Sequence, residues 1–306
     1  MQATLTTTCK FQGHGLHTGR PVRMTVRPAP AGHGIVFRRV DVLGLAQDIP
    51  ALWSEVIVSP LNTRIENADG VYVSTIEHLM AAFAGLGIHN ALVEINAPEV
   101  PILDGSAAPF VRGLLAAGIR RQDAPLEAIE ILAPVELREG AVFARLEPAA
   151  GFEIDFAIDF EDAAIGAQAL RLNMANGSFL RNLCDSRTFC RRADVEAMQA
   201  AGLALGGTYE NAVVVEGAQV LSPSGLRHAN EPVRHKMLDA LGDLYTAGAP
   251  ILGRYIGNRA GHAVTNRLLR ALFAQPTAWR KITVSAEQAA RLPGTRIGAA
   301  DLAHVA

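Results

Sequence analysis

Residues 230–248 read NEPVRHKMLDALGDLYTAG, and this stretch predicts a helix that carries polar side chains along one face. His235 and Asp239 are four residues apart, so they lie on the same face of that helix, one turn apart. An imidazole and a carboxylate placed in this way can reach a single metal ion, and Asp243 continues the face by another turn. Because a catalytic zinc ion takes three protein ligands and leaves a position for water, we expect another part of the chain to supply the third ligand. The apolar residues of the stretch form the stripe expected of a core-facing helix: Val233, Met237, Leu238, Leu241 and Leu244.

A second helix is expected where the run IEHLMAAFAGLG begins, after Ser74 and Thr75. Ser74 with Glu77 fits a capping box, and Gly87 marks the helix end. His78 follows Glu77 directly, and neighbouring helical residues project about 100° apart. A metal ligand at His78 would therefore leave Glu77 beside the ion, where a carboxylate can take a proton from water. Helix capping alone is the alternative role for Glu77.

The remaining pattern indicates strands around these helices. Strand-like alternation or extended stretches cover residues 22–27, 35–39, 128–137 and 152–160. In each half of the chain the strands come first and the helices follow, with a strand among them. This order favours α+β layers over a doubly wound parallel sheet. The pattern restarts near Asp123–Pro125, so we predict two domains, residues 1–124 and 125–285, with a C-terminal tail over residues 286–306.

Composition restricts the kind of protein. The chain has 306 residues, of which 49% are hydrophobic and 19% charged, as expected of globular domains. A net charge of −2 argues against a nucleic-acid partner. The three cysteines form no CxxC motif and suit a reducing compartment. Because there is neither a signal-peptide core nor a run of about 18 apolar residues, we expect a soluble cytoplasmic protein without stable membrane insertion.

The residues by themselves leave the function open. A single HxxxD pair on a helix is common and is often just a hydrogen-bonded surface pair. HExxH, GxSxG and Walker motifs are absent from the sequence. His14 and His17 lie in a glycine-rich opening and are weak evidence, while Asp104 in an Asp-Gly turn is expected to be structural. These observations make a zinc hydrolase one candidate among several.

Four longer runs carry a resemblance: GLHTGRPVRMTVRPAPAGHGIVFRR (residues 15–39), STIEHLMAAFAGLGIHNALVEINAPEVPILDGSAAPFV (74–111), VRHKMLDALGDLYTAG (233–248) and AGHAVTNRLL (260–269). Together they resemble the bacterial UDP-3-O-acyl-N-acetylglucosamine deacetylases, zinc amidases of the committed step of lipid A synthesis. The match extends from about Thr7 to about Trp279 in the order and spacing of the family. It implies hydrolysis of the acetamide of UDP-3-O-acyl-N-acetylglucosamine to UDP-3-O-acyl-glucosamine and acetate.

The resemblance also implies the metal site and its base. One catalytic Zn²⁺ per chain would be held by His78, His235 and Asp239, with water in the fourth position. Glu77 would be the general base that acts on this water. His262 would be the general acid that protonates the leaving amine, and Asp243 would hold His262 in place.

Three further residues match groups that contact the substrate. Thr188 would help to stabilise the oxyanion, and Lys236 and Phe189 would line the path of the acylated UDP-amino-sugar. In the family fold, two similar α+β domains, each a small sheet layered with two helices, pack with the zinc between them. A βαβ insert near residues 190–215 would form an apolar passage for the acyl chain, and we expect a monomer.

Two alternatives and two departures stay open. A non-catalytic protein of this fold could hold an acyl group in the passage, and a zinc amidase of the same kind could act on another acylated sugar. The family commonly has Asp-Glu-Phe where this chain has Asn230-Glu231-Pro232, at the edge of the nucleotide pocket. Some members also carry a cysteine near the active site, ahead of the Glu-His motif, where this chain has Leu61-Asn62-Thr63-Arg64. Neither the acyl length nor the choice between zinc and iron follows from the sequence.

Overall fold

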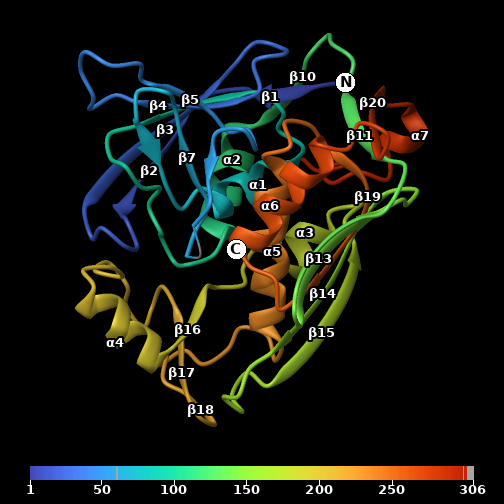
Figure 1. Cartoon of the computed structure of the whole chain (residues 1–306). Coiled ribbons are helices and arrows are strands. Elements are labelled where there is room, and N and C mark those ends of the chain that lie inside the picture. The colour runs from blue at the N-terminus through green and yellow to red at the C-terminus, as the bar shows by residue number, and fades with distance from the viewer. Residues whose placement is uncertain (60, 299, 302–306) are drawn as a thin grey trace.

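Four central helices lie between two β-sheets in the computed structural model, which describes residues 1–59, 61–298 and 300–301 (Figure 1). The helices are α1 (Glu77–Leu86), α2 (Ala108–Ala117), α5 (Glu231–Tyr245) and α6 (His262–Phe273). α1 packs against both α2 and α5, and α5 packs against α6. This layering of helices on sheets confirms the predicted α+β class. Within the described residues, every helix is too short or too polar to cross a membrane.

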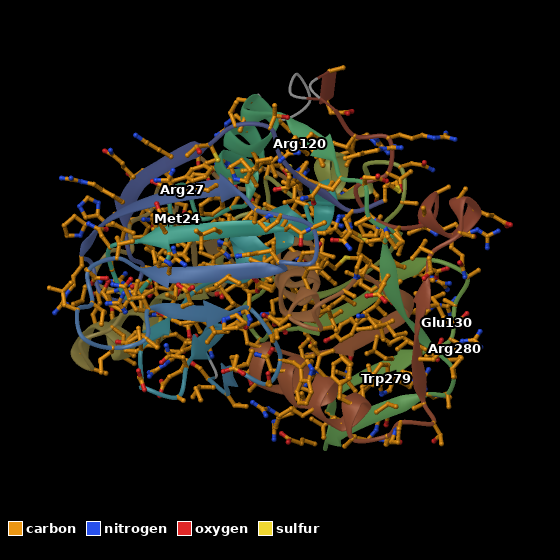
Figure 2. All side chains as sticks on the ribbon, turned by 90° about the horizontal axis from the view of Figure 1, so that it is seen from above. Met24, Arg27, Arg120, Glu130, Trp279 and Arg280 are labelled. Carbon is orange, nitrogen blue, oxygen red and sulfur yellow. The ribbon has the colours of Figure 1, made fainter. Side chains whose placement is uncertain are left out.

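The first sheet has the strand order β2-β3-β9-β4-β5. Its strands are β2 (Cys9–His14), β3 (Pro21–Pro28), β9 (Ala91–Ile95), β4 (Ile35–Arg39) and β5 (Asp48–Pro50). The predicted strands over residues 22–27 and 35–39 are thus confirmed as β3 and β4. In β3 the side chain of Met24 is buried, whereas that of Arg27 is half exposed and pairs with Glu94 on β9 (Figure 2). Because side chains alternate between the two faces of a sheet, one face of this sheet packs against the core and the other faces solvent.

The second sheet has the strand order β12-β13-β19-β11-β20, and β19 also pairs with β14, which pairs with β15. Its strands are β11 (Glu127–Ile131), β12 (Val135–Glu139), β13 (Val142–Glu147), β14 (Phe152–Asp159), β15 (Ala167–Asn173), β19 (Ile251–Asn258) and β20 (Trp279–Thr283). α6 packs against β12 and β13, and α5 packs against β14 and β15. Glu130 and Arg280 of this sheet lie on the opposite side of the molecule from Met24 and Arg27 of the first (Figure 2).

Smaller elements complete the fold. β16 (Phe189–Arg191) and β17 (Val213–Glu216) are parallel neighbours joined through α4 (Arg192–Ala200), which makes a βαβ unit at the lower left of Figure 1. α4 has no buried residue. The other elements are β1 (Ala3–Leu5), β6 (Val56–Ile57), β7 (Arg64–Glu66), β8 (Tyr72–Val73), β10 (Ile119–Arg121), β18 (Gln219–Val220), α3 (Ser178–Asn182) and α7 (Ala286–Ala289).

The buried apolar side chains form one continuous core that includes residues of both sheets and of the four central helices. α1 is at its centre, because all ten of its residues are buried, Glu77 and His78 among them. The proposed domains over residues 1–124 and 125–285 share this core, so the division between them stays a prediction. In the predicted tail, residues 286–289 form α7 and Leu292 is buried, whereas residues 299 and 302–306 lie outside the described residues.

The backbones of α1 and α5 approach each other at Gly242. A Cβ atom at this position would lie 2.0 Å from the backbone oxygen of Glu77 and 3.1 Å from the backbone nitrogen of Ala81. Only glycine fits so close to another backbone. Gly242 therefore sets the separation between the helix that carries Glu77 and His78 and the helix that carries His235 and Asp239.

Replacing Gly242 by alanine is expected to lower the free energy of unfolding. Helix propensity alone would favour alanine by about 1 kcal/mol, but the new methyl group meets main-chain atoms that cannot rotate away. Overpacking of this kind costs about 1–3 kcal/mol, and it also separates the two helices. Urea denaturation measures the stability. A protein more stable than the unchanged one would contradict the close approach.

Candidate active site at the contact of α1 and α5

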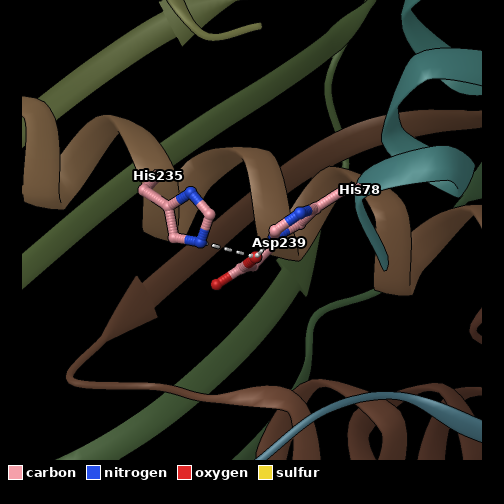
Figure 3. A group of neighbouring side chains, drawn as sticks. All are labelled: His78, His235 and Asp239. Carbon is pink, nitrogen blue, oxygen red and sulfur yellow. Dashed lines mark ion pairs between the residues drawn. The ribbon is translucent and has the colours of Figure 1, made fainter. Parts of the chain in front are cut away.

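His78 on α1 and His235 and Asp239 on α5 come together at the contact between these helices (Figure 3). The Asp239 Oδ1 atom lies 3.3 Å from Nε2 of His235 and 3.6 Å from Nε2 of His78. One ligand atom from each of the three residues lies within 4.8 Å of the other two, and all three residues are buried. The structure thus assembles the residues that were expected to hold a metal ion.

The chemistry of this group fits a metal ion. Asp239 Oδ1 is buried without a hydrogen-bond partner among the described residues, which is unfavourable for a carboxylate oxygen unless a cation satisfies it. Burial lowers the pKa of His235 to about 4, so this imidazole is neutral. The carbonyl oxygen of Ser186 can only accept, so Nδ1 of His235 donates to it at 2.9 Å and leaves the lone pair on Nε2. Two imidazole nitrogens and a carboxylate are a ligand set that zinc prefers.

Asp239 is held in its charged form. Burial raises its pKa, but the interactions with His235, with Lys236 and with neighbouring His262 outweigh this effect and place the pKa well below the usual value. The Lys236 Nζ group donates to Asp239 Oδ2 at 3.2 Å. The carboxylate is therefore available as a ligand at neutral pH.

Glu77 is buried beside these residues, but it does not cap its helix. Its Oε2 atom accepts a hydrogen bond of 3.0 Å from the backbone N–H of Thr63. The predicted capping box is wrong, because Ile76 is the N-cap residue and the Ser74 hydroxyl donates to the carbonyl of Pro98. Thr75 has a φ of 57°, which turns the chain between Ser74 and the helix. Burial raises the pKa of Glu77 above its ordinary value, as suits a general base.

His262, the first residue of α6, lies on the other side of Glu77. Its Nδ1 atom is 2.9 Å from Oδ2 of Asp243 and 3.2 Å from Oδ1. Its Nε2 atom is 4.0 Å from Oε1 of Glu77 and 3.8 Å from Oδ2 of Asp239. Burial opposes the charged imidazolium, but the surrounding carboxylates, Asp243 above all, outweigh it and raise the pKa of His262 to about 9. A histidine with this pKa carries a proton that it can donate at neutral pH.

A groove of about 770 Å³ leads to this group from the βαβ unit. Its lining includes most of the residues expected to contact the substrate and the metal: Thr188, Phe189, Lys236, His235, Asp239 and His262. α4 lines the groove with apolar side chains such as Val195 and Met198. His17 also lines it, and both ring nitrogens of this buried histidine have no hydrogen-bond partner among the described residues.

A buried ion pair fixes the segment that carries Thr188 and leads into β16 at Phe189. The Arg187 Nε atom lies 2.9 Å from Oε1 of Glu231, and both side chains are almost fully buried. The same carboxylate oxygen accepts from the backbone N–H of Arg187 at 2.9 Å. Because Glu231 is the first residue of α5, this contact ties β16 to the helix of His235 and Asp239. Glu231 belongs to the Asn230-Glu231-Pro232 segment in which the sequence departs from the family pattern.

Sequence reasoning missed two buried polar residues of the site, Thr63 and Asn266. The Thr63 hydroxyl bonds Asp243 Oδ1, and Asn266 Nδ2 bonds the Thr63 Oγ1 atom at 3.2 Å. One signal in the sequence could have indicated Asn266, because it lies one turn after His262 on the buried face of the helix. Thr63 belongs to the Leu61-Asn62-Thr63-Arg64 stretch that departs from the family pattern. Its role could not be seen from the sequence, because its partner Asp243 is 180 residues away in the chain.

The chain is similar over most of its length to one family of proteins. The family model described as LpxC, UDP-3-O-acyl N-acetylglycosamine deacetylase, matches residues 2–274. A UDP-3-O-acyl-N-acetylglucosamine deacetylase of Phenylobacterium zucineum is 51% identical over 288 residues, which are 94% of this chain and 98% of that protein. Proteins of the same name from Idiomarina loihiensis and Shewanella frigidimarina are 46% and 44% identical, and these matches cover 94% and 99% of both chains.

Proposed function

The chain belongs to the UDP-3-O-acyl-N-acetylglucosamine deacetylase family, and from this premise we propose how its buried residues carry out the reaction. It is a hydrolase that removes the acetyl group of UDP-3-O-acyl-N-acetylglucosamine, a step of lipid A biosynthesis. We propose that His78, His235 and Asp239 hold one zinc ion. The observation that carries this assignment is the buried, unpartnered Oδ1 atom of Asp239 between two imidazole nitrogens.

A zinc ion in this position would lower the pKa of a bound water to about 7 and polarise the amide carbonyl. Glu77 takes the proton of the attacking water, for which its raised pKa and its place beside His78 are suited. Thr188, which lines the groove, donates a hydrogen bond to the oxyanion that develops on the carbonyl oxygen.

An amide nitrogen leaves only after it gains a proton, and His262 supplies it. The hydrogen bond from its Nδ1–H to Asp243 leaves Nε2 as the atom that faces Glu77 and Asp239. Asp243 fixes the tautomer and stabilises the imidazolium. The two halves of the proton transfer, from water to Glu77 and from His262 to the amine, thus use side chains whose Oε1 and Nε2 atoms lie 4.0 Å apart.

The groove supports the assignment of the substrate. Lys236 is placed to contact the anionic UDP-sugar, and Phe189 forms an edge-to-face pair with Phe160 at a ring distance of 5.5 Å. We propose that the acyl chain lies along α4, in the apolar part of the groove. We also propose that the enzyme works in the cytoplasm as a monomer.

Metal removal tests the proposed reaction directly. Protein stripped by a chelator is expected to lose nearly all release of acetate from UDP-3-O-acyl-N-acetylglucosamine, and one Zn²⁺ per chain is expected to restore it. A parallel sample restored with Fe²⁺ serves as the control for metal identity. Full acetate release from the stripped protein would contradict the metal-dependent mechanism, and restoration by Fe²⁺ alone would contradict the assignment of zinc.

A further inference from the structure

Thr63 contacts both of the carboxylates that flank the proton-transfer path. It lies in the loop before β7 and is fully buried. Its backbone N–H donates to Oε2 of Glu77 at 3.0 Å, and its hydroxyl donates to Oδ1 of Asp243. Glu77 is on α1 and Asp243 is on α5, so a single loop residue spans the two helices at the site.

The direction of the hydroxyl bond follows from the neighbouring donor. The Asn266 amide nitrogen donates to the Thr63 oxygen at 3.2 Å, so the hydroxyl proton is free to point at Asp243. An ionised carboxylate can only accept. Asp243 therefore receives two donors on different oxygens, the Thr63 hydroxyl on Oδ1 and Nδ1–H of His262 on Oδ2.

Two donors restrict the carboxylate more than one does. With His262 alone, the Asp243 carboxylate group could rotate about its Cβ–Cγ bond and carry the imidazole with it. The second bond from Thr63 fixes the carboxylate plane, which in turn holds Nε2 of His262 4.0 Å from Oε1 of Glu77. Displacements of about 1 Å at such a site can lower rates by about 100-fold.

We propose that Thr63 is a positioning residue for the deacetylation. Its hydroxyl orients His262 through Asp243, and its backbone N–H holds Glu77. This role rests on the proposed function, because it acts through the proposed acid and base. Thr63 is not expected to contact the substrate, so its loss should change kcat and leave KM nearly unchanged.

The substitution Thr63→Val removes the hydroxyl and keeps both the shape and the backbone N–H. We expect kcat to fall by about 10–100-fold, the loss typical of a hydrogen bond to a charged group, with KM within about threefold of wild type. The matched control Thr63→Ser keeps the hydroxyl and should recover most of the lost turnover. Zinc content and thermal unfolding of each variant show whether the site and the fold persist. A Thr63→Ser protein as slow as Thr63→Val would contradict the role of the hydroxyl.

A double-variant cycle with His262→Gln tests the route of the effect. If Thr63 acts through Asp243 and His262, then adding Thr63→Val to His262→Gln should lower kcat by less than about threefold. An equal loss in both backgrounds would overturn the inference. A wild-type kcat for the His262→Gln protein would instead overturn the assignment of His262 as the acid. If the His262→Gln protein is slow but the Thr63→Val protein has a wild-type kcat, only the positioning role of Thr63 is overturned.

Discussion

A Glu77→Gln protein is expected to keep its zinc and to lose turnover by about 10²–10⁴-fold, the range typical of a general base. Glutamine has the shape of glutamate, and its amide oxygen can still accept from the backbone N–H of Thr63, so the helix contact should survive. What is lost is a group that can take a proton from water. Acetate release and zinc content, measured on the same sample, separate these two effects.

A matched control for this prediction is Glu287→Gln on α7. The Glu287 side chain is 78% exposed and, within the part of the chain that the structure describes, pairs only with Arg291 along the helix. Its loss should therefore leave kcat and zinc content unchanged. Normal turnover of the Glu77→Gln protein would contradict the assignment of Glu77 as the general base. Loss of zinc from this protein would show that Glu77 is a ligand instead.

A His78→Ala protein is expected to lose both zinc and activity. Removing groups that merely support metal ligands lowers metal affinity by about 10–100-fold, so removing a ligand should exceed this range. The remaining pair on α5 would leave the ion with too few protein ligands for a stable catalytic site. Competition with a chromogenic chelator measures the zinc affinity, and acetate release measures the activity.

His14→Ala is the matched control for this second prediction, because His14 is exposed at the end of β2 and lies outside the groove lining. It should bind zinc with the affinity of the unchanged protein. Full zinc and full activity in the His78→Ala protein would show that the metal ligands have been assigned wrongly.

The helices that carry the site were predictable because their patterns are local. The apolar stripe of residues 230–248 has the period of a helix, and all five of its predicted core residues are buried in α5. The placing of His235 and Asp239 on one face follows from the same period. The deacetylase function, by contrast, came from the resemblance and is confirmed by the family match, since an HxxxD pair alone does not define a reaction.

Other features depend on contacts that no local pattern contains. The expected strand over residues 128–137 is two strands, because β11 pairs with β19 and β20 whereas β12 pairs with β13. β15 was not predicted because none of its residues is buried, and it is held by its ladder with β14. Thr63 and Asn266 meet across 203 residues of sequence. Such pairs become visible only when the fold brings distant loops and helices together.

The complete burial of α1 has a consequence for synthesis on the ribosome. This helix leaves the exit tunnel as part of the first sheet and its loops, long before α5, which begins at Glu231, has been made. Until then the face of α1 that packs against α5, which includes Glu77 and His78, has no partner to cover it. We therefore expect the nascent N-terminal half to be the stage at which exposed apolar surface makes this chain most prone to aggregation.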